Sequence, residues 1–191
     1  MKDKKFRYMW NNEREDGGEY VDVGEMLYAV TNVVDGDTID VDMDGKTERL
    51  RLIGIDTPET KDPRKPVQCF GQEASDKATE LLLNQKIKLE FDETQSDRDK
   101  YDRLLAYVYR EDGLFFNKWM IENGYAYEYT YNIPYKYQTE FKEAENNACS
   151  NQLGLWSTDT CSGSPDLEDS SIEEQVESPT ENSNQQTEPE N

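Results

Sequence analysis

Two aspartates and one arginine of this chain have the residue types and the spacing to bind a phosphate through a cation. Asp37 begins a predicted strand, and Arg51 and Asp56 lie on the next strand and at its exit. A turn at Asp44-Gly45 brings Asp37 and Asp56 to the same end of the sheet. Two converging carboxylates repel each other unless a cation lies between them, and a neighbouring guanidinium can hold a phosphate there. We therefore expect a cation site beside Arg51.

Each of these short motifs has a plainer interpretation when it is taken alone. The DGDT segment that begins at Asp35 is typical of a turn, and the DTPE segment that begins at Asp56 can simply start a loop or a helix. Arg103 can be a solvated charge in a turn. The combination of these residues, rather than any single one, predicts the site.

The absence of histidine excludes several chemistries. None occurs in the 191 residues, so Ser-His-Asp and Cys-His nucleophiles, HExxH zinc sites and two-histidine phosphodiesterases cannot be built. Three cysteines without a histidine also cannot complete a four-ligand structural zinc site. Carboxylates with main-chain carbonyls remain, and these ligands suit calcium or magnesium.

The cysteines Cys69, Cys149 and Cys161 allow at most one internal disulfide. Cys149 and Cys161 are the pair nearest in sequence, and we expect Cys69 to be a free thiol with a packing role. The alternative is that all three are reduced and partly buried.

Charge divides the chain into one folded unit with polar ends. The net charge is −21 and the hydrophobic content is 34%. Residues 162–191 contain acids but no basic or aromatic residue, which predicts a disordered acidic tail. Residues 1–18 are polar and are predicted to be loosely ordered, which leaves one folded domain over residues 19–161. No stretch approaches the roughly 18 apolar residues of a membrane span, and no signal peptide is visible.

Hydrophobic periodicity predicts a mainly β fold with helices. Strands are expected over about residues 26–34, 39–43, 48–55, 86–91 and 105–109, and helices over residues 71–84, 116–123 and about 137–151. The first strands predict an antiparallel meander with Asp40, Asp42 and Asp44 on its solvent face. A five-stranded OB-fold barrel, built as a meander with about three α-helices, fits this order better than a parallel sheet.

Five segments of the chain carry a family resemblance. They are, in order, DGDT, LRLIGIDTPET, FGQEAS, DKYDRLLAYVY and GLW. In this order and spacing the chain resembles the staphylococcal nuclease (thermonuclease) family over about residues 28–157. The resemblance implies an OB barrel with three helices and a calcium-dependent phosphodiesterase that acts on DNA and RNA. The implied reaction cleaves the P–O5′ bond and leaves 3′-phosphate ends.

The resemblance also implies roles for individual residues. Asp37 and Asp56 match the two calcium carboxylates, and Thr57 matches the position whose main-chain carbonyl is the third protein ligand. Glu59 matches the carboxylate that holds and deprotonates the attacking water. Arg51 and Arg103 match the two arginines that grip the scissile phosphate. Lys100 and Tyr101 match two residues that contact a terminal phosphate of the nucleotide.

Tyrosines alternate along residues 125–131, which places four rings on one face of an extended segment. Such a face is either a stacking platform for bases or an amphipathic strand packed on the barrel. The resemblance places one tyrosine of this region against the nucleotide base, and the candidates are Tyr129 and Tyr131. Trp156 is expected to fill the core.

Charges outside the predicted site have opposite implications for the binding of nucleic acid. Lys61, Arg64 and Lys65 form a basic loop after the DTPE segment, which either flanks the site or is simply solvated. The folded unit is nevertheless acidic, so binding of nucleic acid should depend on calcium and on local basic residues. One hypothesis is that the acidic tail competes with nucleic acid, in which case deletion of residues 162–191 raises affinity most at low salt.

Two alternatives belong to other functional classes. One is a non-catalytic OB-fold module that binds nucleic acid or protein, which the acidic charge favours and the complete set of polar site residues opposes. The other is a calcium-binding acidic surface protein, which needs neither arginine. We expect a monomeric, calcium-dependent nuclease whose substrates are single-stranded or denatured DNA and RNA. The sequence leaves the compartment unknown, although the resemblance favours an extracellular or envelope-associated protein.

Overall fold

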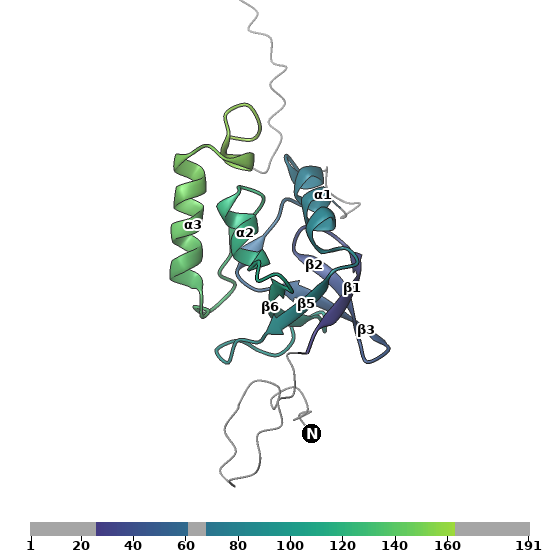
Figure 1. Cartoon of the computed structure of the whole chain (residues 1–191). Helices are drawn as coiled ribbons and strands as arrows, with labels where there is room; N and C mark the ends of the chain where they lie inside the picture. The colour runs from purple at the N-terminus through teal and green to yellow at the C-terminus, as the bar shows by residue number, and fades with distance from the viewer. Residues whose placement is uncertain (1–25, 61–67, 163–191) are drawn as a thin grey trace, which may run out of the picture.

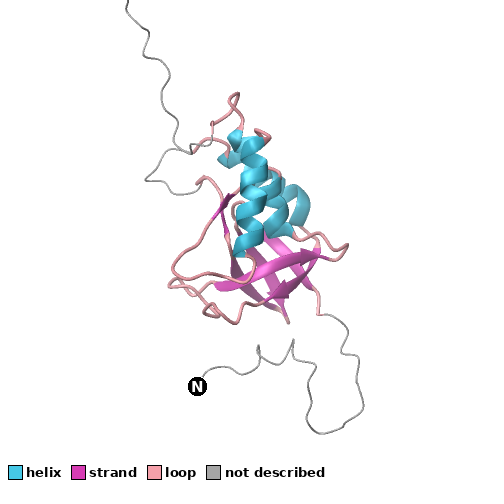
Figure 2. Cartoon of the chain, turned by 90° about the vertical axis from the view of Figure 1, so that its left-hand side faces the viewer, coloured by secondary structure: helices cyan, strands magenta, loops and turns pink. Residues whose placement is uncertain are grey.

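The structure is a computed structural model that describes residues 26–60 and 68–162. The polar N-terminal segment, the acidic tail beyond residue 162 and the basic residues Lys61, Arg64 and Lys65 lie outside the described residues. Within the described part, the strands form a barrel and the helices gather on one side of it (Figure 1, Figure 2).

Five strands close the barrel in the order β1-β2-β3-β6-β5. A separate two-stranded sheet pairs β4 with β7. The predicted five-stranded OB-type barrel is therefore confirmed. The bounds are β1 Tyr28–Val33, β2 Thr38–Met43, β3 Lys46–Leu52, β4 Ile55–Asp56, β5 Lys86–Glu90, β6 Leu104–Arg110 and β7 Tyr127–Glu128.

The barrel is not a meander throughout, which corrects one expectation. β1, β2 and β3 are successive antiparallel strands as predicted, but β6 runs parallel to β3, and β5 closes the barrel against β1. A sheet that stays open leaves unpaired N–H and C=O groups at both edges, and these two pairings satisfy them. The parallel register sets Arg51 opposite Leu105, so Arg103, which directly precedes β6, lies alongside β3.

The hairpin between β2 and β3 forms at the predicted dipeptide. Asp44 and Gly45 have φ values of 57° and 81°, and a two-residue hairpin of this kind requires positive φ at both central residues. The resulting register places Thr38 opposite Arg51. The hairpin thus brings the DGDT segment to the end of the strand that carries Arg51.

Asp40 of β2 is buried, whereas the sequence pattern places it on the solvent face. Its carboxylate accepts hydrogen bonds from Nε and Nη2 of Arg49 at 2.7 and 3.0 Å and from Asn32 at 3.0 Å. The hydrogen bond from the guanidinium of Arg49 is the largest influence on the pKa of Asp40 and holds it below its usual value. An acid can therefore occupy a buried strand position when a cross-strand partner neutralises it.

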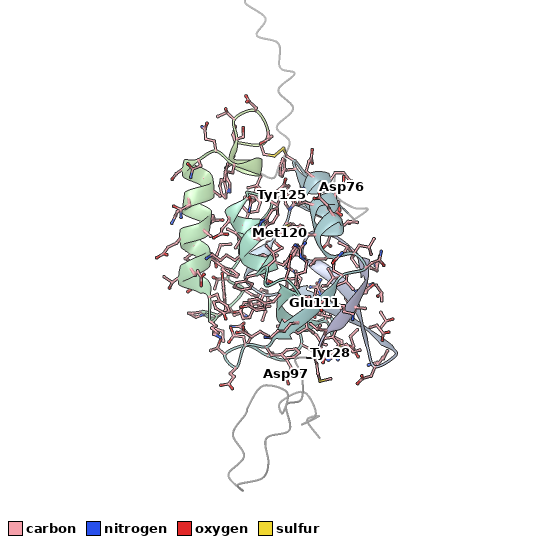
Figure 3. The ribbon with its side chains drawn as sticks, in the orientation of Figure 1. Tyr28, Asp76, Asp97, Glu111, Met120 and Tyr125 are labelled. Atoms are coloured by element: carbon pink, nitrogen blue, oxygen red, sulfur yellow. A yellow bond between two sulfur atoms is a disulfide. The ribbon has the colours of Figure 1, made fainter. Side chains whose placement is uncertain are left out.

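The helices have bounds close to those predicted: α1 Gly71–Leu82, α2 Phe116–Glu122 and α3 Gln138–Ser150, followed by a short 3-10 helix over Gly154–Trp156. α2 ends just before Gly124, whose φ of 70° favours glycine. A side chain on Gly124 would meet the main chain of Leu153, so the segment after α3 packs directly against the end of α2. Met120 of α2 is fully buried (Figure 3).

One buried polar side chain joins α2 to the barrel. Asn117 is fully buried, and its amide donates to the carbonyl of Ile53 at 2.9 Å and accepts from the N–H of Val108 at 2.9 Å. Trp156 is only half-buried and packs edge-on against Tyr127, whereas its neighbour Leu155 is fully buried. The core residue of this segment is therefore Leu155 rather than the predicted Trp156.

The disulfide joins Cys69 to Cys161, and Cys149 is a free, exposed cysteine (Figure 3). Neither the Cys149–Cys161 pair that is nearest in sequence nor the alternative of three reduced cysteines is therefore correct, and the expected free thiol at Cys69 is wrong. The Cα atoms of Cys69 and Cys161 lie 5.8 Å apart although 92 residues separate them in sequence. Proximity in sequence cannot reveal this pairing, because the fold of the barrel and helices brings the two ends together.

No helix in the described ranges combines the length and the apolar character needed to cross a membrane.

Candidate active site

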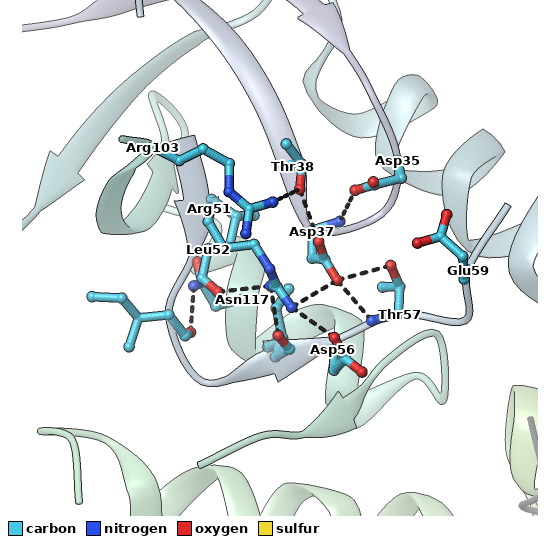
Figure 4. A network of polar contacts seen from close by, with 12 residues as sticks. Asp35, Asp37, Thr38, Arg51, Leu52, Asp56, Thr57, Glu59, Arg103 and Asn117 are labelled. Carbon is cyan, nitrogen blue, oxygen red and sulfur yellow. Dashed lines mark hydrogen bonds and ion pairs between the residues drawn. The ribbon is translucent and has the colours of Figure 1, made fainter. Parts of the chain in front are cut away.

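Arg51 of β3 lies between two carboxylates at one end of the barrel (Figure 4). Its Nη2 lies 3.2 Å from Oδ2 of Asp37 and 2.6 Å from Oδ1 of Asp56. Its Nη1 donates to the main-chain carbonyls of Ile55 at 2.8 Å and Leu52 at 3.2 Å. Only 14% of the Arg51 side chain is exposed. The two aspartates that the sequence predicts to converge do so, with the guanidinium of Arg51 between them.

Asp37 also joins the DGDT and DTPE segments. Its Oδ2 accepts hydrogen bonds from the main-chain N–H of Thr57 at 2.9 Å and from the Thr57 hydroxyl at 3.1 Å. Its Oδ1 accepts from the hydroxyl of Thr38 at 3.0 Å. A Cβ on Gly36 would lie 2.6 Å from Cγ2 of Thr57, so this close approach requires glycine. The contact fixes the main chain of Thr57 beside Asp37.

Negative charge accumulates at this end of the barrel. Burial, the charge of Asp37 and the charge of Glu59 raise the pKa of Asp56 to about 6, and Arg51 offsets only part of that rise. Burial and the charge of Asp37 raise the pKa of Asp35 to about 7. The single guanidinium of Arg51 therefore does not neutralise the group, and a cation would relieve the repulsion.

Asp35 is a member of the site that the sequence analysis missed. Its Oδ1 accepts a hydrogen bond from the main-chain N–H of Asp37 at 3.1 Å. The available signal was its position two residues before Asp37 within one tight turn, a spacing at which an Asp side chain commonly bonds the main chain.

Glu59 lies on the loop that follows β4. Figure 4 shows its carboxylate pointing in the direction of Asp35 and Asp37. Its main chain is held at two points by Gln68. The N–H of Glu59 donates to Oε1 of Gln68 at 2.7 Å, and the N–H of Gln68 donates to the carbonyl of Glu59 at 3.0 Å. Glu59 lies at the edge of the acidic cluster, which consists of Asp35, Asp37 and Asp56.

Arg103 approaches the site from the start of β6. Its Nε and Nη2 each lie 2.7 Å from Oδ2 of Asp99, and its Nη1 lies 3.5 Å from the hydroxyl of Thr38 (Figure 4). Burial favours a raised pKa for Asp99, but hydrogen bonds from Arg103 and from the N–H of Tyr101 outweigh it and lower the pKa. Asp99 is therefore an ionised partner that orients Arg103. Nothing in the local sequence distinguishes Asp99, because acids in a charged loop are common.

The predicted nucleotide contacts form an exposed group next to Arg103. Tyr101, Tyr131 and Tyr129 are 68%, 64% and 42% exposed. The Lys100 ammonium lies 4.9 Å from the ring centre of Tyr101, and its pKa is raised mainly by Tyr101 and also by Tyr131 and Tyr129. The Cζ atom of Arg103 lies 5.4 Å from the Tyr101 ring centre. Residues distant in sequence thus come together beside the acidic cluster.

The four alternating tyrosines do not share one role. Tyr125 stacks on Trp119 with ring centres 5.8 Å apart, and Tyr127 packs edge-on against Trp156. Only Tyr129 and Tyr131 face solvent, with ring centres 6.4 Å apart. The packing interpretation is therefore correct for the first two rings, and the second two remain available to a ligand.

The donor atoms at the site suit a hard cation. Within residues 26–60 and 68–162, no three acids or cysteines are placed so that they could bind a metal ion on their own. Asp37 and Asp56 nevertheless converge on one nitrogen of Arg51, and the main chain of Thr57 is fixed beside them. Two carboxylates and a carbonyl are oxygen ligands of the type that calcium prefers, with other positions left for water or phosphate oxygens.

Comparison with known proteins gives consistent matches. The staphylococcal nuclease homologue family matches residues 49–158. The thermonuclease of Staphylococcus hyicus is 44% identical over 133 residues, which cover 70% of this chain and 77% of that protein. The thermonuclease of Staphylococcus intermedius is 43% identical over 135 residues, with 71% and 79% covered. Endonuclease YncB of Bacillus subtilis is 43% identical over 125 residues, with 65% and 58% covered. With this fold and this cluster of charges at the end of its barrel, the chain belongs to the staphylococcal nuclease family.

Proposed function

We propose that the chain is a calcium-dependent phosphodiesterase that hydrolyses DNA and RNA at the P–O5′ bond and leaves 3′-phosphate ends. Membership of the family supports a nuclease function. One observation supports the calcium dependence and the mechanism. Two carboxylates converge on the guanidinium of Arg51, with Glu59 at their edge and Arg103 beside them. This arrangement combines a cation site, phosphate ligands and a base.

Calcium is the cation we assign to Asp37, Asp56 and the main-chain carbonyl of Thr57. When bound, it supplies positive charge to the scissile phosphate. The oxygen donors support a hard cation, and the repulsion among the acids supports a divalent one.

Arg51 and Arg103 are the two residues we assign to the phosphate. Phosphodiester hydrolysis adds negative charge to oxygens that are already anionic, so catalysis requires fixed positive charge around them. A guanidinium can donate two parallel hydrogen bonds to a phosphate, which an ammonium cannot. The carbonyls of Ile55 and Leu52 orient Arg51, and Asp99 orients Arg103. Both guanidinium groups are therefore positioned before substrate binds.

Glu59 is the general base in this proposal. It accepts a proton from the water that attacks phosphorus in line with the leaving O5′. A base must stand within hydrogen-bond reach of its water, about 2.6–3.2 Å, so the position of the Glu59 main chain matters for the rate.

The substrate is a single-stranded or denatured nucleic acid, bound in part by Lys100, Tyr101, Tyr129 and Tyr131. Exposed rings stack on bases of any sequence, which agrees with activity on both DNA and RNA. We also propose that the protein acts as a monomer.

Digestion of heat-denatured DNA and of RNA tests this proposal, with calcium and then with a chelator, beside the variant Glu59→Gln. We expect calcium-dependent cleavage that the substitution reduces by about 10²- to 10⁴-fold. Glu59→Gln keeps the size of the side chain and removes the base, and circular dichroism controls for folding. Calcium binding without cleavage by the wild-type protein would instead support a binding module.

A further inference from the structure

A two-point hydrogen-bonded clamp holds the main chain of Glu59. The side-chain Oε1 of Gln68 accepts the Glu59 N–H at 2.7 Å, and the Gln68 N–H donates to the Glu59 carbonyl at 3.0 Å. The main-chain N–H and C=O of Glu59 are thus both bound by one residue. The position of Gln68 therefore fixes the point from which the Glu59 carboxylate reaches the site.

Gln68 is in turn fixed by the residues that follow it. Cys69 is covalently bound to Cys161. Phe70 has a φ of 63°, a conformation that a non-glycine residue keeps only where its surroundings enforce it. Its ring packs against Tyr125 with ring centres 5.5 Å apart. Gly71, which begins α1, donates its N–H to the carbonyl of Gln68 at 3.1 Å.

The loop around Glu59 also packs closely on the start of α1. A Cβ on Gly71 would lie 2.6 Å from Cγ2 of Thr60 and 3.0 Å from the carbonyl oxygen of Pro58. The residues on either side of Glu59 therefore touch the same helix end that Gln68 bonds. A shift of Gln68 and Cys69 is transmitted to Glu59 through these contacts.

The far end of the disulfide is anchored to the helices. Thr160, next to Cys161, donates its hydroxyl to the carbonyl of Gly154 at 2.6 Å. The N–H of Leu155 donates to the carbonyl of Gly124 at 2.9 Å, which attaches this segment to the end of α2. The disulfide therefore ties the Glu59 clamp to a part of the fold that is itself held in place.

We propose that Gln68 is a positioning residue for the base Glu59, and that the Cys69–Cys161 disulfide holds Gln68 in its clamping position. This inference rests on the proposed function for its effect on rate. Gln68 acts through the Glu59 main chain and does not touch the substrate. Small displacements of a reacting group are costly to the chemical step, whereas substrate binding uses the arginines, the cation and the exposed tyrosines.

The first experiment compares Gln68→Met with Gln68→Glu. Methionine has nearly the length of glutamine but places a methyl group where glutamine has Oε1, so the Glu59 N–H loses its oxygen acceptor, whereas glutamate keeps one. We expect Gln68→Met to lower kcat by about 10- to 100-fold and to leave KM within about twofold. Gln68→Glu is expected to recover most of the lost kcat. Equal kcat values for Gln68→Met and the wild type would overturn the proposal.

The second experiment removes the disulfide by the double substitution Cys69→Ser and Cys161→Ser, with Cys149→Ser as the matched control. Cys149 is exposed and unpaired, so its substitution is expected to leave kcat unchanged. The double variant is expected to lose kcat as Gln68→Met does. Full kcat in a folded double variant would show that the disulfide does not hold the clamp.

Hydrogen exchange of the Glu59 amide supplies a readout that does not depend on activity. In the calcium-free protein, we expect this amide to exchange at least about tenfold faster in Gln68→Met and in the double cysteine variant, since both lose its protection. An unchanged exchange rate in both would refute the positioning role. Absence of cleavage by the wild-type protein would refute the proposed function, while the exchange measurement would still decide whether the clamp exists.

Discussion

Removal of the Cys69–Cys161 disulfide is expected to lower the free energy of unfolding by several kcal/mol, apart from any effect on catalysis. The bond joins the residue that precedes the turn into α1 to the segment that follows the short 3-10 helix. In the folded protein both ends are also held by hydrogen bonds and packing. For the free energy of unfolding, the main effect of its loss is therefore a larger number of conformations for the unfolded chain; a small shift of Gln68 in the folded protein affects the rate far more than the stability.

The size of the effect follows from the length of chain that the bond closes. For a separation of 92 residues, the loop-entropy relation gives about 4.6 kcal/mol at 25 °C. The shorter loop of a Cys149–Cys161 pairing would give about 2.8 kcal/mol by the same relation. The observed pairing therefore predicts the larger loss of stability.

Urea unfolding measures this difference. The Cys149→Ser protein is compared with the triple serine variant, so that no free thiol can exchange with the disulfide. A chelator is present throughout, because a cation that binds only the folded state would add stability of its own. The unfolding free energy of the triple serine variant is also expected to fall more steeply with urea concentration, since its unfolded chain exposes more surface.

A difference in unfolding free energy below about 1 kcal/mol would refute this reasoning, because the loop-entropy relation cannot give so small a value for so long a loop. The same small difference would result if Cys149, rather than Cys69, paired with Cys161, because the Cys149→Ser protein would then already lack the disulfide.

Three further predictions test the site and the core. Arg103→Ala is expected to slow cleavage of single-stranded DNA by about 10²- to 10⁴-fold, and Arg103→Lys to recover only part of this, because lysine lacks the planar fork; near-wild-type initial rates for the alanine variant would contradict its role. Tyr131→Ala and Tyr129→Ala are each expected to weaken binding of single-stranded DNA by about 1–3 kcal/mol, measured by fluorescence anisotropy, if their rings stack on bases; unchanged affinity would exclude them from the binding surface. Burial tends to raise the pKa of Asp92, but hydrogen bonds from neighbouring main-chain N–H and side-chain hydroxyl groups hold it below 3.8. Because a lowered pKa adds stability that is lost as pH falls, the wild type should lose unfolding free energy more steeply than Asp92→Asn below about pH 4; equal slopes in acid unfolding would refute this.

The site could be predicted to the extent that its residues belong to short motifs. The DGDT and DTPE segments each place their acid at a strand end, and the Asp44-Gly45 turn sets the register between them. The approach of Asp37 to Arg51 therefore follows from local pattern. Asp56 reaches the same place through the tertiary structure, because the chain turns after β3 into β4, which pairs with β7 in a separate sheet. Asp99 could not be identified in this way, because its importance arises from hydrogen bonds that exist only in the folded chain. Asp35 had a local signal in its spacing from Asp37, but its raised pKa depends on burial in the fold.

Element types, the β2–β3 hairpin, the exclusion of histidine chemistry and the candidacy of Asp37, Arg51 and Asp56 could all be read from the sequence, because alternation, turn dipeptides and composition act over a few residues. The parallel pairing of β3 with β6, the disulfide partner of Cys69 and the partial burial of Tyr125 and Tyr127 beside the exposed Tyr129 and Tyr131 emerge only in the folded chain. Each of these depends on how the barrel closes and where the helices pack on it. Contacts between distant segments reflect the best burial of the whole chain, and no local pattern encodes them.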